Sequence, residues 1–127
     1  MKCVVFDFDG VIHRYREGWK DGSIYDEANQ QVVDLIQYIL EEKNDCSVCI
    51  CSTRDPEQIV KWVHDKHLFP AKVIQDDVKF WNDGDCVGVT NRKLPAVLYI
   101  DDRAYRYIPN NDYKSAKDFF GTLSYLM

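Results

Sequence analysis

Two carboxylates one residue apart follow the first apolar run of the chain. The run at 3–6 (Cys-Val-Val-Phe) is followed directly by Asp7, Phe8, Asp9 and Gly10. Carboxylates at the end of a hydrophobic strand are costly to hold unless a cation or a chemical step uses them. The pair therefore indicates a metal site or an acid–base site rather than a part of the core.

Two later apolar runs, 48–51 and 97–100, also end in polar side chains. The residues that follow them are Ser52, Thr53, Arg54, Asp101 and Asp102. Acidic and hydroxyl side chains that directly follow several predicted strands indicate an active site. Several carboxylates gathered at one place need a counter-charge, and an all-oxygen ligand set favours Mg²⁺. The candidate metal ligands are Asp7, Asp9, Asp101 and Asp102.

The elements that must position these residues alternate between strand and helix. Apolar runs predict strands at 2–6, 46–51, 72–75 and 96–100. Helical spacing of apolar residues predicts helices at 28–42, from Asp55 to before Pro70, and at 115–127. Strands separated by helices predict right-handed crossovers, a parallel sheet and helices on both of its faces. The expected fold class is α/β, a Rossmann-like three-layer α/β/α sandwich with a central, mainly parallel sheet.

In such sheets ligands bind at the carboxyl ends of the strands. Asp7, Ser52 and Asp101 all follow predicted strands directly, so we expect them at one edge of the sheet. Motif and topology therefore point to the same place.

The length of 127 residues fits a single domain, 1–127. Segment 11–27 suits a hairpin or flap and is too short for a folded cap domain. Segment 76–92 contains the turn signal Asp-Gly-Asp at 83–85, which predicts a small hairpin. In the last helix, the residues expected to face inward are Ala116, Phe119, Phe120, Leu123 and Leu126.

A net charge of -5 argues against sequence-blind binding to nucleic acid or to an anionic membrane. No stretch approaches the ~20 apolar residues of a membrane helix, and no apolar leader precedes Asp7, so a cytoplasmic protein is expected. The five cysteines fit core filling better than a metal or disulfide site. Strand alternation places Cys49 and Cys51 on one face and Cys46 on the other.

Four motifs in order resemble the haloacid-dehalogenase-like (HAD) superfamily of aspartate-nucleophile phosphatases, in a capless form. They are the segment 7–11 (Asp-Phe-Asp-Gly-Val), Ser52 within Ser-Thr-Arg, Lys93 within 91–95, and the pair Asp101 and Asp102. The resemblance spans most of the chain. In layout it is most similar to the phosphatase domain of phage-type polynucleotide kinase.

The resemblance implies an Mg²⁺-dependent phosphomonoesterase with an aspartyl-phosphate intermediate. Asp7 is then the nucleophile and Asp9 the general acid and base. Ser52, or alternatively Thr53, and Lys93 are the residues that hold the phosphoryl group, with Arg54 beside them. Asp7, Asp101 and the backbone carbonyl of Asp9 bind Mg²⁺, and Asp102 binds it directly or through a second layer. The alternative is a non-catalytic phosphate-binding or protein-interaction module on the same fold.

The expected substrates are phosphorylated small molecules, with nucleotides or nucleic-acid ends as the favoured class. A capless pocket is open, which suits a large substrate or a pocket completed by another subunit, so a homo-oligomer is also considered. Four aromatic residues in the loops either stack on a base or pack the flap, and packing is expected for Trp19; the four are Tyr15, Trp19, Tyr105 and Tyr107. His13 lies in the flap and is assigned no catalytic role.

Overall fold

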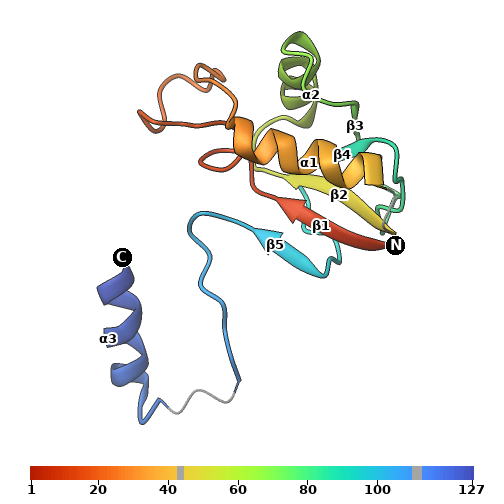
Figure 1. Ribbon diagram of the computed structural model, residues 1–127. Helices are drawn as coiled ribbons and strands as arrows, with labels where there is room; N and C mark the ends of the chain where they lie inside the picture. Colours follow the sequence, from red (N-terminus) through yellow and green to blue (C-terminus); the bar gives the residue numbers. More distant parts are fainter. Residues whose placement is uncertain (43–44, 110–112) are drawn as a thin grey trace.

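The computed structural model describes residues 1–42, 45–109 and 113–127 (Figure 1). The strands are β1 (Lys2–Phe6), β2 (Cys46–Cys51), β3 (Ala71–Val73), β4 (Val87–Thr90) and β5 (Leu98–Ile100). The helices are α1 (Gln30–Glu42), α2 (Pro56–Asp65) and α3 (Ala116–Leu126). The predicted strands at 2–6 and 46–51 are confirmed to the residue, and the other predicted elements are confirmed with ends shifted by a few residues.

All five strands form one parallel sheet in the order β3-β4-β2-β1-β5. The register aligns the last residues of the inner strands, because Phe6 pairs with both Ile50 and Ile100, and Cys51 pairs with Thr90. The residues that follow β1, β2, β4 and β5 therefore leave the sheet at one edge. The chain is thus an α/β protein with a parallel central sheet, compatible with a Rossmann-like sandwich.

Helices α1 and α2 pack on the same face of the sheet (Figure 1). Asp55 caps α2 by accepting a hydrogen bond from the backbone N–H of Glu57, and Pro56 supplies the fixed φ angle suited to a first turn. The core on this face joins Phe6 and Ile50 of the sheet to Ile36 of α1 and Trp62 of α2. The two βα units that precede or follow Asp7, Asp9 and Ser52, namely β1 with α1 and β2 with α2, are therefore firmly packed.

The opposite face of the sheet is covered by residues that precede and follow β4 in the chain, namely Ile74, Val78, Trp81, Leu94 and Ala96. The hairpin predicted for 76–92 is wrong, because Val87–Thr90 forms β4, an inner parallel strand between β3 and β2, and no strand precedes it in that segment. Trp81 instead lies across β4, and a Cβ on Gly88 would stand 2.6 Å from the indole. The Asp-Gly-Asp turn at 83–85 lies between Trp81 and β4, and it does not connect two hairpin strands.

Helix α3 does not join the core. The inward residues expected on it are exposed, with Phe120 at 62% and Leu126 at 64%, and no residue of α3 is buried. Phe119 instead stacks with Tyr107 and Tyr113 in the segment before the helix, so α3 stands apart from the sheet (Figure 1). In the described part of the chain, the second helical layer of the expected sandwich is therefore not formed.

All five cysteines are free. Cys49 packs on the Trp81 side of the sheet with Cys51 beside it, whereas Cys46 packs on the helical side, as strand alternation predicts. Among the described residues, no helix has the length and apolar character needed to cross a membrane.

Candidate functional site

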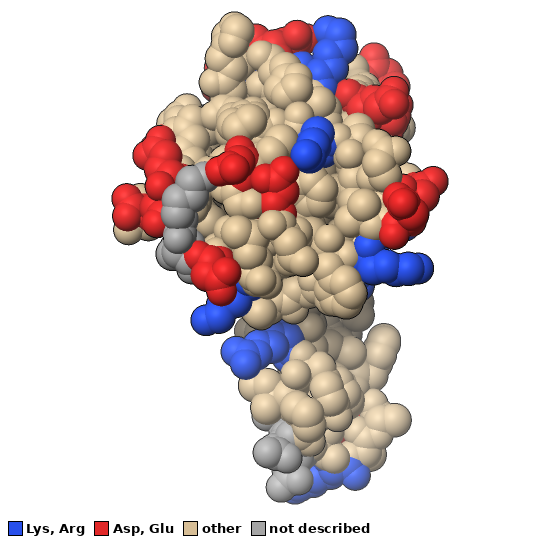
Figure 2. All heavy atoms as spheres, turned by 90° about the vertical axis from the view of Figure 1, so that its right-hand side faces the viewer, with Lys and Arg blue, Asp and Glu red and all other residues tan. Residues whose placement is uncertain are grey.

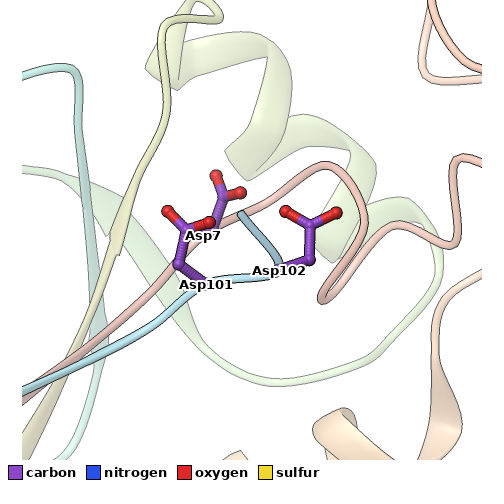
Figure 3. Close-up of side chains that lie close together, drawn as sticks. All are labelled: Asp7, Asp101 and Asp102. Carbon is purple, nitrogen blue, oxygen red and sulfur yellow. The ribbon is translucent and has the colours of Figure 1, made fainter. Parts of the chain in front are cut away.

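Three carboxylates meet at the carboxyl edge of the sheet. Asp7 follows β1, and Asp101 and Asp102 follow β5, the neighbouring strand. One oxygen from each residue lies within 4.8 Å of the others, and Figure 3 shows the three side chains gathered at these two strand ends. Strand order reverses beside β1, since β2 lies on one side of it and β5 on the other. Such a switch point is where open α/β sheets bind ligands.

Backbone hydrogen bonds fix the cluster. The N–H of Asp7 donates to the carbonyl of Ile100 at 2.8 Å, which ties the end of β1 to the end of β5. The N–H of Phe8 donates to Oδ1 of Asp7 at 2.8 Å, and the N–H of Arg103 donates to Oδ1 of Asp101 at 2.8 Å. The loop conformation therefore sets the direction of both carboxylates.

Gly10 makes room for the third carboxylate. Its φ angle is +85°, and a Cβ at this position would lie 2.2 Å from Oδ2 of Asp102. Glycine is suited to this position because it has no Cβ and tolerates a positive φ. The absence of a side chain at Gly10 thus allows the Asp102 carboxylate to lie close to the loop after β1.

The cluster carries excess negative charge. Burial first, and then repulsion from Asp101, Asp102 and Asp9, raises the pKa of Asp7 to about 6, although the hydrogen bond from the Phe8 N–H acts in the opposite direction. A cation among the three carboxylates would remove this repulsion. The donor set is all oxygen, with no histidine or cysteine among its members, and such a set suits Mg²⁺.

Asp9 does not belong to this cluster. Nε of Arg54 donates to Oδ1 and Oδ2 of Asp9 at 3.1 and 2.9 Å, and His13 Nδ1 lies 2.8 Å from Oδ1. Burial raises the pKa of Asp9, but the hydrogen bonds from His13 and Arg54 outweigh it and leave the pKa below its usual value. The structure thus gives neighbouring aspartates opposite pKa shifts.

His13 is the residue whose role the sequence did not reveal. It is fully buried, so it cannot contact a substrate. Its Nε2 accepts a hydrogen bond from the backbone N–H of Asp26 at 2.9 Å, and the ring proton therefore sits on Nδ1 and points to Asp9. The available signal was the four-residue separation between Asp9 and His13. Asp26 in turn binds Arg16 at 2.6 Å, which anchors the flap behind the site.

The phosphate-binding candidates lie at the same edge of the sheet. Ser52 is buried, and its Oγ accepts a hydrogen bond from the N–H of Arg54 at 3.2 Å, whereas Thr53 is exposed. Because Oγ is here the acceptor, the Ser52 hydroxyl keeps its own proton for donation. Lys93 is exposed in the loop after β4, with Nζ 5.1 Å from the Tyr99 ring. Burial raises the pKa of the Cys51 thiol, the Asp7 carboxylate raises it further and the Lys93 ammonium lowers it, so both charges lie near this one side chain.

A further hydroxyl at this edge was missed because β4 was expected to be a hairpin arm. Thr90 ends β4, is almost fully buried, and accepts a hydrogen bond at Oγ1 from the N–H of Arg92. Arg92 itself is bonded to the carbonyls of Gln75 and Val78. This arginine holds the segment that covers the sheet.

Of the two flap aromatic residues, Tyr15 takes the packing role, one of the two that the sequence left open, whereas Trp19 does not take the packing role expected for it. Tyr15 lies against His13 and Tyr25, with ring centroids 5.6 and 6.3 Å apart, and so packs the flap. Trp19, for which packing was expected, is 69% exposed. The indole of Trp19 therefore lies largely exposed at the surface, with the Arg54 guanidinium carbon 5.9 Å from its ring centroid.

Comparisons of this chain with family models, curated proteins and solved structures return no match. What the site can do therefore follows from its own geometry. That geometry comprises an acidic cluster suited to a cation, a neighbouring carboxylate held by Arg54 and His13, and hydroxyls with a lysine at the same sheet edge.

Proposed function

We propose that this chain is an Mg²⁺-dependent phosphomonoesterase that works through an aspartyl-phosphate, on a capless HAD-like fold. The observation that carries the proposal is the meeting of Asp7, Asp101 and Asp102 within 4.8 Å at a strand-order switch point. Asp7 is the half-buried member of the three and has the neighbouring carboxylate of Asp9 two residues away. This combination supplies a cation site, a nucleophile and a proton carrier.

Asp7, Asp101 and Asp102, with the Asp9 carbonyl, would hold Mg²⁺, which would supply charge compensation for the phosphoryl oxygens. A carboxylate of Asp7 attacks phosphorus, and the bond from phosphorus to the leaving oxygen breaks. Asp9 gives its proton to that oxygen. Ser52 donates a hydrogen bond to the phosphoryl group, and Lys93 balances its charge.

The second step restores the enzyme. Asp9 takes a proton from water, the water oxygen attacks phosphorus, and the bond from phosphorus to Asp7 breaks to leave inorganic phosphate. For this step the low pKa of Asp9 is suitable, because a base must be ionised.

In the first step Asp9 must be protonated, because it donates a proton to the leaving oxygen. Movement of Arg54 away from Asp9 can produce this state. A substrate phosphoryl group competes with Asp9 for the guanidinium, since arginine binds both kinds of oxyanion in the same two-pronged manner. Transfer of Arg54 to the phosphoryl group would remove the main cation beside Asp9 and raise its pKa. Substrate binding thereby prepares the proton donor.

Turnover of p-nitrophenyl phosphate with Mg²⁺ tests the proposal. We expect turnover that chelation of the metal removes and that Asp7→Asn abolishes. Asp34→Asn is the matched control, because Asp34 is exposed on α1 and bonded only to Gln30 in this structure's described contacts. The proposal fails if Asp7→Asn and Asp34→Asn have the same activity, or if no phosphoester is turned over.

The second candidate is a non-catalytic phosphate-binding or interaction module. The low pKa of Asp9, with its carboxylate paired to Arg54, is the observation that favours it. Such a module binds phosphate and Mg²⁺ without turnover, and Asp7→Asn then leaves phosphate binding largely intact.

A further inference from the structure

Trp19 is the large aromatic side chain that the flap does not use. The other tryptophans, Trp62 and Trp81, are 8% and 7% exposed, whereas Trp19 is 69% exposed. An indole left in water forgoes the free energy of burying a large apolar surface. Its exposure beside a candidate active site therefore calls for a functional explanation.

The backbone that carries Trp19 is nonetheless well fixed. Its loop is closed by hydrogen bonds that involve Tyr25, whose hydroxyl donates to the carbonyl of Gly18 and accepts from the N–H of Glu17. The carbonyl of Gly22 accepts from Nη1 of Arg54 at 2.7 Å and from Nε2 of Gln58 at 3.3 Å. The loop is thus bonded to the start of α2. Exposure of the indole is a property of an ordered loop.

Two neighbours also hold the indole itself. A Cβ on Gly22, whose φ is +88°, would lie 3.3 Å from the ring, so glycine permits this close approach. The guanidinium carbon of Arg54 lies 5.9 Å from the ring centroid, within the range of a cation–π contact. Arg54 therefore links the indole directly to Asp9.

A hollow of about 300 Å³ opens at this point. Its walls are Trp19, Gly22, Thr53, Arg54, Asp55 and Gln58. This volume is at the lower limit of small-molecule sites and suits one ring-sized group rather than a whole large ligand. The walls combine an aromatic face with the amide of Gln58 and the carboxylate of Asp55, which can meet polar atoms at the edge of a ring.

We propose that this hollow is a leaving-group subsite in which Trp19 stacks on a planar aromatic ring of the phosphomonoester. The inference rests on the proposed phosphatase function and adds its substrate class. Arg54 lines the hollow and also binds Asp9, two residues from Asp7, so one molecule can place its phosphoryl group at Asp7 and its ring at Trp19. The ring is an aryl group or a nucleobase, since both have the flat π-face that stacking requires.

Phosphonates that cannot be hydrolysed separate ring recognition from phosphate recognition. The probes are methylphosphonate, phenylphosphonate and the phosphonate analogue of adenosine monophosphate, each titrated calorimetrically with Mg²⁺ present. We expect phenylphosphonate or the adenosine analogue to bind about tenfold more tightly than methylphosphonate, as one stacked ring provides. The tighter of the two ring-bearing probes identifies the ring as aryl or nucleobase.

Variants assign the effect to the indole. Trp19→Leu should remove the preference for ring-bearing probes and leave methylphosphonate binding unchanged, while Trp19→Phe should retain most of the preference. Phe80→Leu is the matched control, because Phe80 is 61% exposed and lies outside the hollow. Since Trp19 is exposed, its replacement does not threaten the core.

Each outcome decides a separate question. Equal affinity for all three probes in the natural protein overturns the subsite and leaves the phosphatase proposal standing. The same holds if the ring preference persists in Trp19→Leu. Failure of every probe, methylphosphonate included, overturns the proposed function and the subsite with it.

Discussion

Nε of Arg54 lies 3.1 and 2.9 Å from the two carboxylate oxygens of Asp9, and its Nη1 lies 2.7 Å from the carbonyl oxygen of Gly22. One guanidinium thus joins the end of β2, the loop after β1 and the flap. The Arg54 side chain is 6% exposed and the Asp9 side chain 25%, so the ion pair is partly shielded from solvent, and removal of one partner costs more than it would in a surface pair. The arginine of the second motif therefore acts first on Asp9.

Arg54→Ala should lower both activity and stability. Without the Arg54 guanidinium, the ionisation of Asp9 is no longer controlled and general acid–base catalysis is lost. Such catalysis contributes about 10²-fold or more to kcat. Loss of hydrogen bonds to a charged group lowers the free energy of unfolding by about 1–3 kcal/mol. Steady-state kinetics with p-nitrophenyl phosphate and urea unfolding measure the two effects.

Arg14→Ala is the control for Arg54→Ala. Arg14 is 46% exposed and its nearest ion-pair partner, Glu27, lies 3.9 Å away. Its removal should change the free energy of unfolding by less than about 0.5 kcal/mol. Matching losses in the two arginine variants would contradict the role given to Arg54.

Stabilisation by Mg²⁺ should depend on pH through Asp7. The folded-state pKa of Asp7 is raised to about 6, mainly by burial and then by its acidic neighbours. The raised pKa means that the metal-free folded state binds this proton more tightly than the unfolded chain. The resulting stabilisation is fully present below about pH 4 and is lost as the pH rises through about 6.

A cation substitutes for that proton, so Mg²⁺ should raise Tm at about pH 7.5 and have little effect at about pH 5. Thermal unfolding with and without Mg²⁺ measures the difference. Asp7→Asn should raise the metal-free Tm at about pH 7.5, because it removes repulsion, and should abolish the Mg²⁺ response. An equal Mg²⁺ response at both pH values, or its survival in Asp7→Asn, would count against the metal site.

The parts of the fold that the sequence predicted correctly depend on local signals. Asp55 followed by Pro56 marks the start of α2 because capping and φ restriction act within one turn. The carboxylates after β1 and β5 were expected together because parallel strands end at the same edge of a sheet. Local chemistry and one topological rule were enough for Asp7, Asp101 and Asp102.

The parts that were wrong depend on contacts distant in sequence. The segment Val87–Thr90 was assigned to a hairpin because a turn signal precedes it, yet it pairs with β2 and β3. Trp81 could be placed only by knowing that Gly88 lies beneath it. The apolar stripe of α3 predicts a buried helix, but periodicity does not say which surface receives it.

His13 shows the same limit within the site. Its bond to Asp9 spans four residues, but its second bond reaches Asp26 across the whole flap. Only the bond from the Asp26 N–H to Nε2 fixes the tautomer of His13, and no local sequence pattern predicts that bond. A buried histidine of this kind is found from the structure.

Replacement of His13 should be costly even though the ring cannot contact substrate. His13→Leu leaves the N–H of Asp26 without its acceptor and removes a donor from Asp9. Such a buried loss is expected to lower the free energy of unfolding by about 2–4 kcal/mol. Urea unfolding of His13→Leu against His64→Leu, a change at an exposed position of α2, gives the comparison. Similar values for the two variants would show that the buried contacts contribute little.

Gly10→Ala should damage the metal site through a steric contact. The new Cβ would lie 2.2 Å from Oδ2 and 2.8 Å from Cγ of Asp102, so this carboxylate must leave its place beside Asp7. A positive φ angle adds about 1 kcal/mol of strain for any residue with a Cβ. We expect Mg²⁺ affinity, measured by calorimetry, to fall at least about tenfold, which corresponds to the loss of one charged ligand.

Gly18→Ala separates the two effects. Gly18 also has a positive φ, +69°, but a Cβ there would have nothing within 4 Å. This variant should therefore lose stability from backbone strain and keep its Mg²⁺ affinity. Equal losses of Mg²⁺ affinity in Gly10→Ala and Gly18→Ala would mean that backbone strain explains the result. The close approach of Gly10 to Asp102 would then have no role in Mg²⁺ binding.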